Sequence, residues 1–311
     1  MKGDDIEAAA ADPSPDKAER LKRLAAVAAV TVAGLLIAAK TGAWLVTGSV
    51  SLLSTLIDSM LDLAASLVNL FAIRHALQPA DREHRFGHGK AEPLAGLAQA
   101  AFVSGSAAFL LFEASQRLIH PVPIGNTTFG IGVMACSIAL TLGLVTFQRY
   151  VVKRTGSVAI SADSLHYSAD LLVNTSVVVA LLLTVHLGWS AADPLFAIGI
   201  SVFILRGAWS IFRSSLDLLM DRELPEHERQ RIREIASAHA GVISLHDLRT
   251  RSSGTKTFIQ FHLEMDGNLT LLEAHEIADD VMDDIEHAFP DAEVLIHEDP
   301  FGVKERRVRF Q

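Results

Sequence analysis

The segment SLLSTLIDSMLDLAASLVNLFAI, residues 51–73, is apolar and long enough to cross a membrane, yet it contains Asp58 and Asp62. Residues four apart lie on the same face of a helix, so the two carboxylates point in one direction. Ionisable groups inside a bilayer are costly and usually mark an ion or proton pathway. A structural alternative is that one aspartate caps a kink or pairs with Lys40. That alternative is weak, because each mid-helix carboxylate costs ~2.5–3.5 kcal/mol on insertion scales.

A second apolar segment, VAISADSLHYSADLLVNTSVVVALLL at residues 158–183, contains His166 and Asp170 at the same spacing of four. Together the two segments offer three carboxylates and one imidazole, which could form a four-coordinate site for a divalent cation. Metal that leaves such a site uncovers charge that protons can neutralise, so exchange of metal for protons is the expected coupling. A histidine among the ligands favours Zn²⁺ or Cd²⁺ over Mn²⁺ or Mg²⁺, while Fe²⁺ stays open.

The composition indicates a membrane protein with a soluble part. Hydrophobic residues make up 50% of the 311 and charged residues 20%, and the mean hydropathy is +0.32, high for an ordinary soluble domain. The net charge of −9 argues against a nucleic-acid partner, because phosphate binding needs a basic surface. The single cysteine, Cys136, excludes a disulfide within one chain.

Six apolar stretches, each near or above the ~20 residues that a spanning helix needs, predict a transmembrane domain over residues 17–220. The acidic residues 1–16 have no apolar core of a signal peptide and predict a disordered tail. Lysines and arginines concentrate on one side of the spans, which places both termini in the cytoplasm. The stretches lie at about 24–46, 50–76, 92–118, 125–150, 158–186 and 192–215.

Residues 221–300 have the character of a small soluble domain, followed by a tail at 301–311. The pattern predicts helix, strand, strand, helix, strand, with both helices on one side of a sheet. Such a sheet leaves edges and one face that need cover, which favours a dimer. The predicted elements are PEHERQRIREIASAHAG, VISLHDLRTRS, TKTFIQFHLEM, LTLLEAHEIADDVMDDIEHAF and AEVLIHEDP.

This domain is rich in groups that zinc accepts as ligands, because neutral imidazole and carboxylate form a typical zinc set. The alternative is a set of surface histidines, and spacing alone does not decide between the two. The alternation of a strand puts two of the candidates, His297 and Asp299, on one side. The candidates are His246, His262, His275, His297 and Asp299.

A third candidate site lies in QPADREHRFGHGKAE, the link between the second and third stretches. Asp81, His84 and His88 would share one face if this link were helical, but Gly87 and Gly89 favour a loop. The alternative is a polar, solvated turn.

The D-x3-D and H-x3-D pairs, the link ALQPADREHRFGHGKAEPLAGLAQ and the HDLRTRSSG, FIQFHLEM and HEDP segments resemble the cation diffusion facilitator family, in particular its bacterial zinc and ferrous-iron efflux branch. The resemblance covers residues 24–300. It implies a homodimer in the bacterial cytoplasmic membrane, six helices per protomer, a cytoplasmic metallochaperone-like domain, and proton-driven export of divalent metal.

The resemblance also implies three metal sites. The transport site would use Asp58, Asp62, His166 and Asp170; a second site would use Asp81, His84 and His88; and a binuclear site bridged by Asp299 would use the four histidines of the soluble domain. Alternating access would carry Zn²⁺ through the transport site, with His166 as the proton carrier because an imidazole titrates near physiological pH.

Two other classes of protein are alternatives to a transporter. A membrane metalloenzyme would need a metal-bound water beside a general base, and no H-E-x-x-H motif is present. A membrane-anchored metal sensor would not need ionisable groups in two separate spans. The sequence therefore favours a transporter that is not an enzyme.

Overall fold

The computed structural model describes residues 15–47, 50–119, 131–189 and 191–303. The predicted N-terminal tail lies outside the described residues except for positions 15 and 16, and so do positions 304–311 of the predicted C-terminal tail. Within the described residues the chain divides into two compact units, with the boundary between Leu216 and Asp217.

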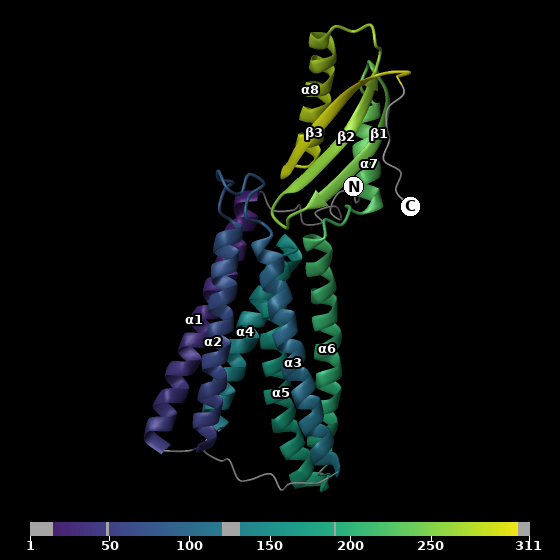
Figure 1. The fold of residues 1–311 in the computed structure, drawn as a ribbon. Helices are drawn as coiled ribbons and strands as arrows, with labels where there is room; N and C mark the ends of the chain where they lie inside the picture. Colours follow the sequence, from purple (N-terminus) through teal and green to yellow (C-terminus); the bar gives the residue numbers. More distant parts are fainter. Residues whose placement is uncertain (1–14, 48–49, 120–130, 190, 304–311) are drawn as a thin grey trace, which may run out of the picture. The chain divides into compact units, whose positions relative to one another are not determined.

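The first unit contains the expected set of long helices, shown in purple to green in Figure 1. Six helices of the described residues are long and apolar enough to cross a membrane. They are α1 (Pro15–Thr47), α2 (Val50–Ala76), α3 (Ala91–Ile119), α4 (Ile131–Thr155), α5 (Val158–Leu187) and α6 (Ala192–Leu219).

The helix α1 starts about two turns before the apolar stretch that predicted it. The additional residues, PDKAERLKR, begin with a proline, which is tolerated in the first turn. They continue with alanine, glutamate, lysine, arginine and leucine, all good helix formers. Hydropathy therefore located the apolar part of this helix and missed its polar beginning.

Small side chains let the helices of the first unit approach closely. Ala25 and Ala26 of α1 belong to a buried cluster with Ile73 of α2 and Val151 of α4. On α6, a Cβ added at Gly207 would lie 2.8 Å from a methyl carbon of a leucine on α5. Alanine and glycine at helix contacts are typical of membrane bundles, where close packing replaces the hydrophobic effect as the driving force.

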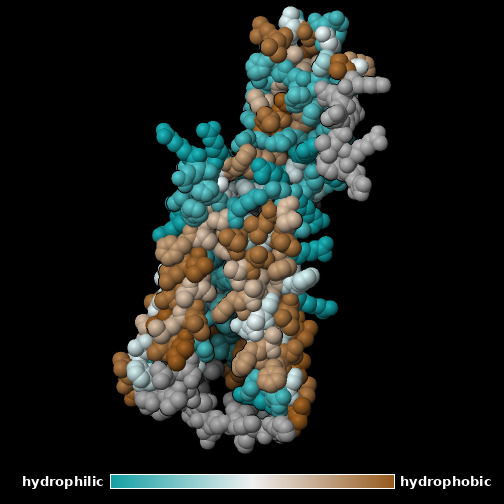
Figure 2. Space-filling model, in the orientation of Figure 1, coloured by the Kyte–Doolittle hydropathy of each residue, from teal (hydrophilic) through white to brown (hydrophobic). Residues whose placement is uncertain are grey.

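The face of these helices that Figure 2 shows is largely apolar, as the brown residues along them indicate. Phe109 and Phe112 of α3 and Trp209 of α6 are exposed, although aromatic side chains of this size normally dominate buried cores. A surface of this kind is suited to contact with lipid or with another membrane helix.

The second unit is an α/β domain with the predicted element order. It contains α7 (Glu226–Ser237), β1 (Val242–Ser252), β2 (Thr257–Met265), α8 (Leu271–Ala288) and β3 (Ala292–Pro300). The sheet order is β1-β2-β3, with β1 antiparallel and β3 parallel to β2. The predicted fold class, six spanning helices plus an α-β-β-α-β domain, is confirmed.

Both helices of this unit cover the same face of the sheet. The alternate residues Ile259, Phe261 and Leu263 of β2 form one buried core with Ile232 of α7 and Val281 of α8. Since side chains alternate across a strand, the residues between them, such as that at position 262, point to the opposite face. The predicted zinc ligands of the strands must therefore be sought on the face without helices.

A capping box fixes the beginning of α8. The hydroxyl of Thr270 accepts a hydrogen bond from the backbone N–H of Glu273, whose carboxylate accepts one from the backbone N–H of Thr270 at 2.8 Å. That backbone hydrogen bond is the main reason why the pKa of Glu273 lies below its usual value. The box satisfies two backbone donors that the first turn would otherwise leave unpaired.

Candidate metal sites

Three of the four predicted intramembrane ligands converge between α2 and α5. The Nε2 atom of His166 lies 3.0 Å from Oδ1 of Asp62 and 3.7 Å from Oδ2 of Asp170. Ligand atoms of the three residues all lie within 4.8 Å of one another. One nitrogen and two oxygens at these distances form a partial shell into which a small divalent cation could fit after modest side-chain adjustment.

The fourth predicted ligand, Asp58, lines the same pocket but is not part of this close group. The pocket has a volume of about 260 Å³ and is bounded by α2, α3, α5 and α6. Its apolar lining includes Phe102, Val103 and Ile204. The site is thus a small group of ionisable side chains on an otherwise apolar wall, an arrangement that strengthens electrostatic attraction to a cation.

In the structure, Lys40 forms its hydrogen bonds with α2 residues other than the two intramembrane aspartates. The Nζ atom of Lys40 donates a hydrogen bond to the carbonyl oxygen of Thr55 at 3.1 Å and one to the hydroxyl of Ser59 at 2.6 Å. Ser59 directly follows Asp58, so the ammonium group binds the same helix. These contacts give Lys40 partners other than the candidate ligands.

A buried aspartate that the sequence analysis did not single out lies one turn before His166. Asp163 is fully buried, and its two oxygens accept hydrogen bonds from Nε2 of Gln99 at 3.1 Å and from Nε2 of Gln148 at 2.6 Å. The donors belong to α3 and α4, so this carboxylate joins three helices. Its spacing of seven from Asp170 was the available signal, because residues seven apart also share a helix face.

A second polar contact beside Asp163 joins α5 to α2. The hydroxyl groups of Ser66 and Tyr167 lie 2.8 Å apart, and both side chains are buried. Buried hydrogen bonds of this kind fix a side chain and its helix in one orientation. The neighbours of His166 therefore hold α5 so that His166 and Asp170 face the pocket.

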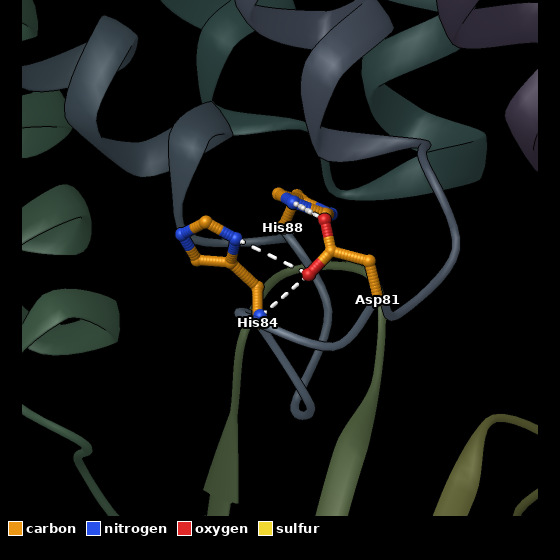
Figure 3. A group of neighbouring side chains, drawn as sticks. All are labelled: Asp81, His84 and His88. Atoms are coloured by element: carbon orange, nitrogen blue, oxygen red, sulfur yellow. Dashed lines mark hydrogen bonds and ion pairs between the residues drawn. The ribbon is translucent and has the colours of Figure 1, made fainter.

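The predicted ligands of the α2–α3 link also converge, although the link is a loop and not a helix. The carboxylate of Asp81 lies between two imidazoles, 3.4 Å from Nδ1 of His84 and 3.4 Å from Nε2 of His88 (Figure 3). Gly87 has a positive φ of 78°, a conformation that glycine adopts without strain. The turn of the loop thus brings Asp81, His84 and His88 together, although the segment is not a helix.

Backbone hydrogen bonds hold the Asp81 carboxylate in this position. Its Oδ1 atom accepts from the N–H of His84 at 2.6 Å and from the N–H of Glu83 at 2.9 Å. The His84 backbone hydrogen bond is the largest cause that lowers the pKa of Asp81, and the nearby imidazoles lower it further. The group is therefore kept in the ionised form that a cation needs.

On the sheet of the second unit, three candidate histidines form a row across the strands. His246 of β1 is paired with His262 of β2, which is paired with His297 of β3. The ring centroids of His246 and His262 lie 5.0 Å apart, and those of His262 and His297 lie 4.6 Å apart. This row lies on the face away from the helices, so three of the candidate ligands lie side by side on one surface.

Asp299 lies beside this row and faces histidines with both oxygens. Its Oδ2 atom is 2.7 Å from Nδ1 of His262 and 3.6 Å from Nε2 of His246, and its Oδ1 atom is 3.1 Å from Nε2 of His297. Asp299 is only 4% exposed. Both ring nitrogens of His246 are buried and have no hydrogen-bond partner among the described residues.

The fifth candidate, His275, is not brought to this row within one chain. It lies on α8, on the other side of the sheet, with its ring nitrogens 3.5 Å from Oδ2 of Asp279 and 3.9 Å from Oε1 of Glu298. Its membership in a shared site with Asp299 stays a prediction.

Comparison with known proteins places both units in one family. Residues 26–220 match the cation efflux transmembrane domain, and residues 224–301 match the cytoplasmic domain of cation efflux proteins. The chain belongs to the cation efflux family. This confirms the resemblance to the cation diffusion facilitators that the sequence motifs indicated.

Members of the cation efflux family with similar sequences cover nearly the whole chain. The cation-efflux pumps FieF of Salmonella newport strain SL254 and of Salmonella typhimurium strain LT2 are each 49% identical over 290 residues, which is 93% of this chain and 96% of the relative. Among solved structures, the metal-bound C-terminal domain of the CzcD transporter from Thermotoga maritima is 30% identical over 25% of this chain and 93% of its own, with a TM-score of 0.25.

Membership in the cation efflux family decides between a transporter, a membrane metalloenzyme and a membrane-anchored sensor. The family consists of transporters, which argues against an enzyme and does not favour a membrane-anchored sensor. Together with the six membrane-capable helices, it makes this chain a multi-pass membrane protein that exports cations.

Proposed function

We propose that this protein is a proton-coupled antiporter that exports divalent transition-metal cations, Zn²⁺ above all and also Cd²⁺ or Fe²⁺, from the bacterial cytoplasm. The observation that carries the proposal is the group Asp62, His166 and Asp170, which converges inside membrane-capable helices beside Asp58. Ionisable side chains at such a depth need a cation or protons to neutralise them. The relatives named as cation-efflux pumps support this direction of transport.

The donor set supports zinc as the main cargo. Zinc accepts nitrogen and carboxylate oxygen in a tetrahedral shell, and four protein ligands are available when Asp58 is counted. Magnesium and manganese prefer shells of oxygen alone. The site is therefore suited to borderline cations that tolerate an imidazole ligand.

Transport follows from alternate exposure of this site to the two sides of the membrane. From the cytoplasm, the ionised carboxylates and the neutral imidazole bind the metal. After the helices rearrange, protons from outside compete for the same atoms and release the metal. The hydrogen bonds of Asp163 to α3 and α4 keep α5 in position on this cycle.

We place the protein in the cytoplasmic membrane as a homodimer with both termini in the cytoplasm. Lysines and arginines at one end of the helices, such as Lys90, Arg149 and Lys153, support this orientation by the positive-inside rule. The match of residues 224–301 to a cytoplasmic domain agrees with it. The face of the sheet without helices and the exposed aromatics of α3 offer surfaces for a second protomer.

The two other clusters are proposed as additional metal sites with a regulatory or structural role. Asp81, His84 and His88 would bind one ion in the loop. In the cytoplasmic domain, the row His246, His262 and His297 with Asp299, together with His275, would bind two. Occupation of a site that favours one conformation shifts the protein toward that conformation. Both sites fit the ligand chemistry of zinc.

A flux assay in proteoliposomes tests the main proposal. Purified protein is reconstituted with a zinc-sensitive dye in one preparation and a pH-sensitive dye in a second. We expect zinc entry to be accompanied by proton movement in the opposite direction, and an imposed proton gradient to drive zinc against its own gradient. Zinc flux without any proton movement would overturn the antiport mechanism but not the transport itself.

Replacing His166 with aspartate is expected to change the selectivity of the transport site. His166→Asp leaves four carboxylates, which favour hard cations, so binding should shift from Zn²⁺ toward Mn²⁺ by about tenfold or more in ratio. Competition calorimetry in detergent measures this ratio, with His186→Asp as a control because His186 lies near the far end of the same helix. An unchanged ratio would remove His166 from the ligands of the metal.

A further inference from the structure

The loop cluster of Asp81, His84 and His88 provides three ligands, one fewer than a closed zinc site usually has. Its central member, His88, is buried, with a side-chain exposure of 5%. One ring nitrogen of His88 faces Asp81, but the other, Nδ1, is buried without a hydrogen-bond partner among the described residues. A buried ring nitrogen without a hydrogen-bond partner costs stability.

A fourth histidine lies next to His88 and comes from a different element. His75 belongs to the last turn of α2, and its ring centroid is 4.5 Å from that of His88. The corresponding distance between His84 and His88, which are both in the cluster, is 4.6 Å. The ring of His75 is therefore as close to the ring of His88 as the ring of His84 is.

A neighbouring glutamine, Gln78, forms a hydrogen bond with the ring of His75. The Nδ1 atom of His75 lies 3.1 Å from Oε1 of Gln78. An amide oxygen only accepts hydrogen bonds, so this contact places the proton of the neutral imidazole on Nδ1 and leaves the lone pair on Nε2. Histidines that bind metals commonly donate their second ring N–H to such an acceptor.

We propose that His75 is a fourth ligand of the loop site, which binds a divalent cation through three imidazoles and the Asp81 carboxylate. In the structure His75 lies outside the group whose ligand atoms are all within 4.8 Å, so it completes the shell by turning its exposed side chain toward His88. Three nitrogens and one oxygen form a closed tetrahedral set for Zn²⁺. Such a set retains its ion and does not pass it on.

The fourth ligand gives the loop site a mechanical connection to the transport site. His75 lies in the last turn of α2, the helix that carries Asp58 and Asp62, whereas the other three ligands lie in the following loop. A metal held by all four would tie the end of this helix to the loop. This inference rests on the proposed metal site in the loop but not on proton coupling or on transport.

Zinc binding to the full-length protein in detergent tests the proposal. Calorimetry is done in a background of Asp62→Ala and Asp299→Ala, which removes ligands from the other two clusters. The zinc binding that is lost when His84→Ala is added to this background is the binding due to the loop site. We expect His75→Phe, which keeps a ring against His88 but removes the donor atom, to weaken that contribution by about 100-fold. Gln78→Leu, which removes only the supporting acceptor, should weaken it by about tenfold.

The matched control is His227→Phe, because His227 is 81% exposed on α7 and outside the three metal clusters; it should leave zinc binding unchanged. Loop affinity that stays at its original value in His75→Phe, while His84→Ala still abolishes it, would overturn the fourth ligand and leave a three-ligand site. If both His75→Phe and His84→Ala keep the zinc binding of the background protein, the loop site itself would be overturned. In both cases the flux of the protein with intact transport ligands remains an independent measure of the proposed function.

Discussion

Zinc flux into proteoliposomes is expected to fall by at least about 100-fold when Asp62 is replaced with alanine. Removal of an outer-shell partner alone typically costs 10–100-fold in metal affinity, and Asp62 is proposed as a direct ligand. Its Oδ1 atom lies 3.0 Å from Nε2 of His166, so it also joins the two helices that form the site. Asp58→Ala and Asp170→Ala should have similar effects.

The Asp62 variant should nevertheless fold, because alanine replaces a costly charge within the membrane by an apolar group. The matched control is Asp193→Ala, which removes a carboxylate near the start of α6 that pairs with Arg117 at 3.7 Å and does not line the pocket. Flux should be retained in this control, and both variants should elute from a gel-filtration column as the wild type does. Wild-type zinc flux in Asp62→Ala would refute the assignment of the transport site.

The sequence was sufficient to predict the spanning helices, because length and hydropathy are local properties. It was less informative at their ends. The polar residues 15–23 continue α1 although they are not apolar, while the predicted start of the fourth span, near residue 125, lies outside the described residues and α4 begins at Ile131. Helix ends depend on capping and helix propensity, and mean hydropathy over a window reports neither of them.

The strands β1 and β3 were predicted with their observed bounds, but their register was not predictable. The pairing of His246 with His262 depends on irregularities of β1 after Val242 and after His246, whereas His262 and His297 pair in the unbroken parallel register of β2 and β3. Such irregularities change which residues oppose each other. A period of two therefore places a histidine on a face of the sheet, whereas the row across three strands requires the pairing itself.

Asp163 illustrates a different limit of prediction from sequence. Its partners, Gln99 and Gln148, lie 64 and 15 residues away along the chain and carry no charge that would mark them. Ligand spacing directs attention to pairs four apart on one helix. A carboxylate that organises the bundle through neutral amides becomes visible only when the helices are packed.

Asp299→Ala is expected to weaken the binding of two zinc ions together in the cytoplasmic domain. A shared carboxylate ligates both ions, so its loss should lower each affinity by about 100-fold, in line with the loss of a direct ligand. The geometry supports sharing, because Oδ2 faces His262 and His246 whereas Oδ1 faces His297. A carboxylate with histidines on both oxygens can bridge two cations.

A fragment starting at Arg222 is suited to this experiment. It retains the core of the second unit and the contacts of Glu223 and Leu224 with Thr250. We expect the fragment to bind about two zinc ions per chain and to gain thermal stability with zinc concentration, because a ligand that binds only the folded state stabilises it. Calorimetry gives the stoichiometry and a melting curve gives the stabilisation.

The control for Asp299→Ala is Asp280→Ala, which removes an exposed carboxylate from α8 and should change neither affinity. Loss of one ion with the other at full affinity would show that Asp299 serves a single ion. Failure of the fragment to bind zinc would instead show that the row of histidines needs the rest of the protein or is not a metal site, and full-length Asp299→Ala would separate these two outcomes. Because the two oxygens of Asp299 contact different histidines, simultaneous weakening is the result expected of a bridging carboxylate.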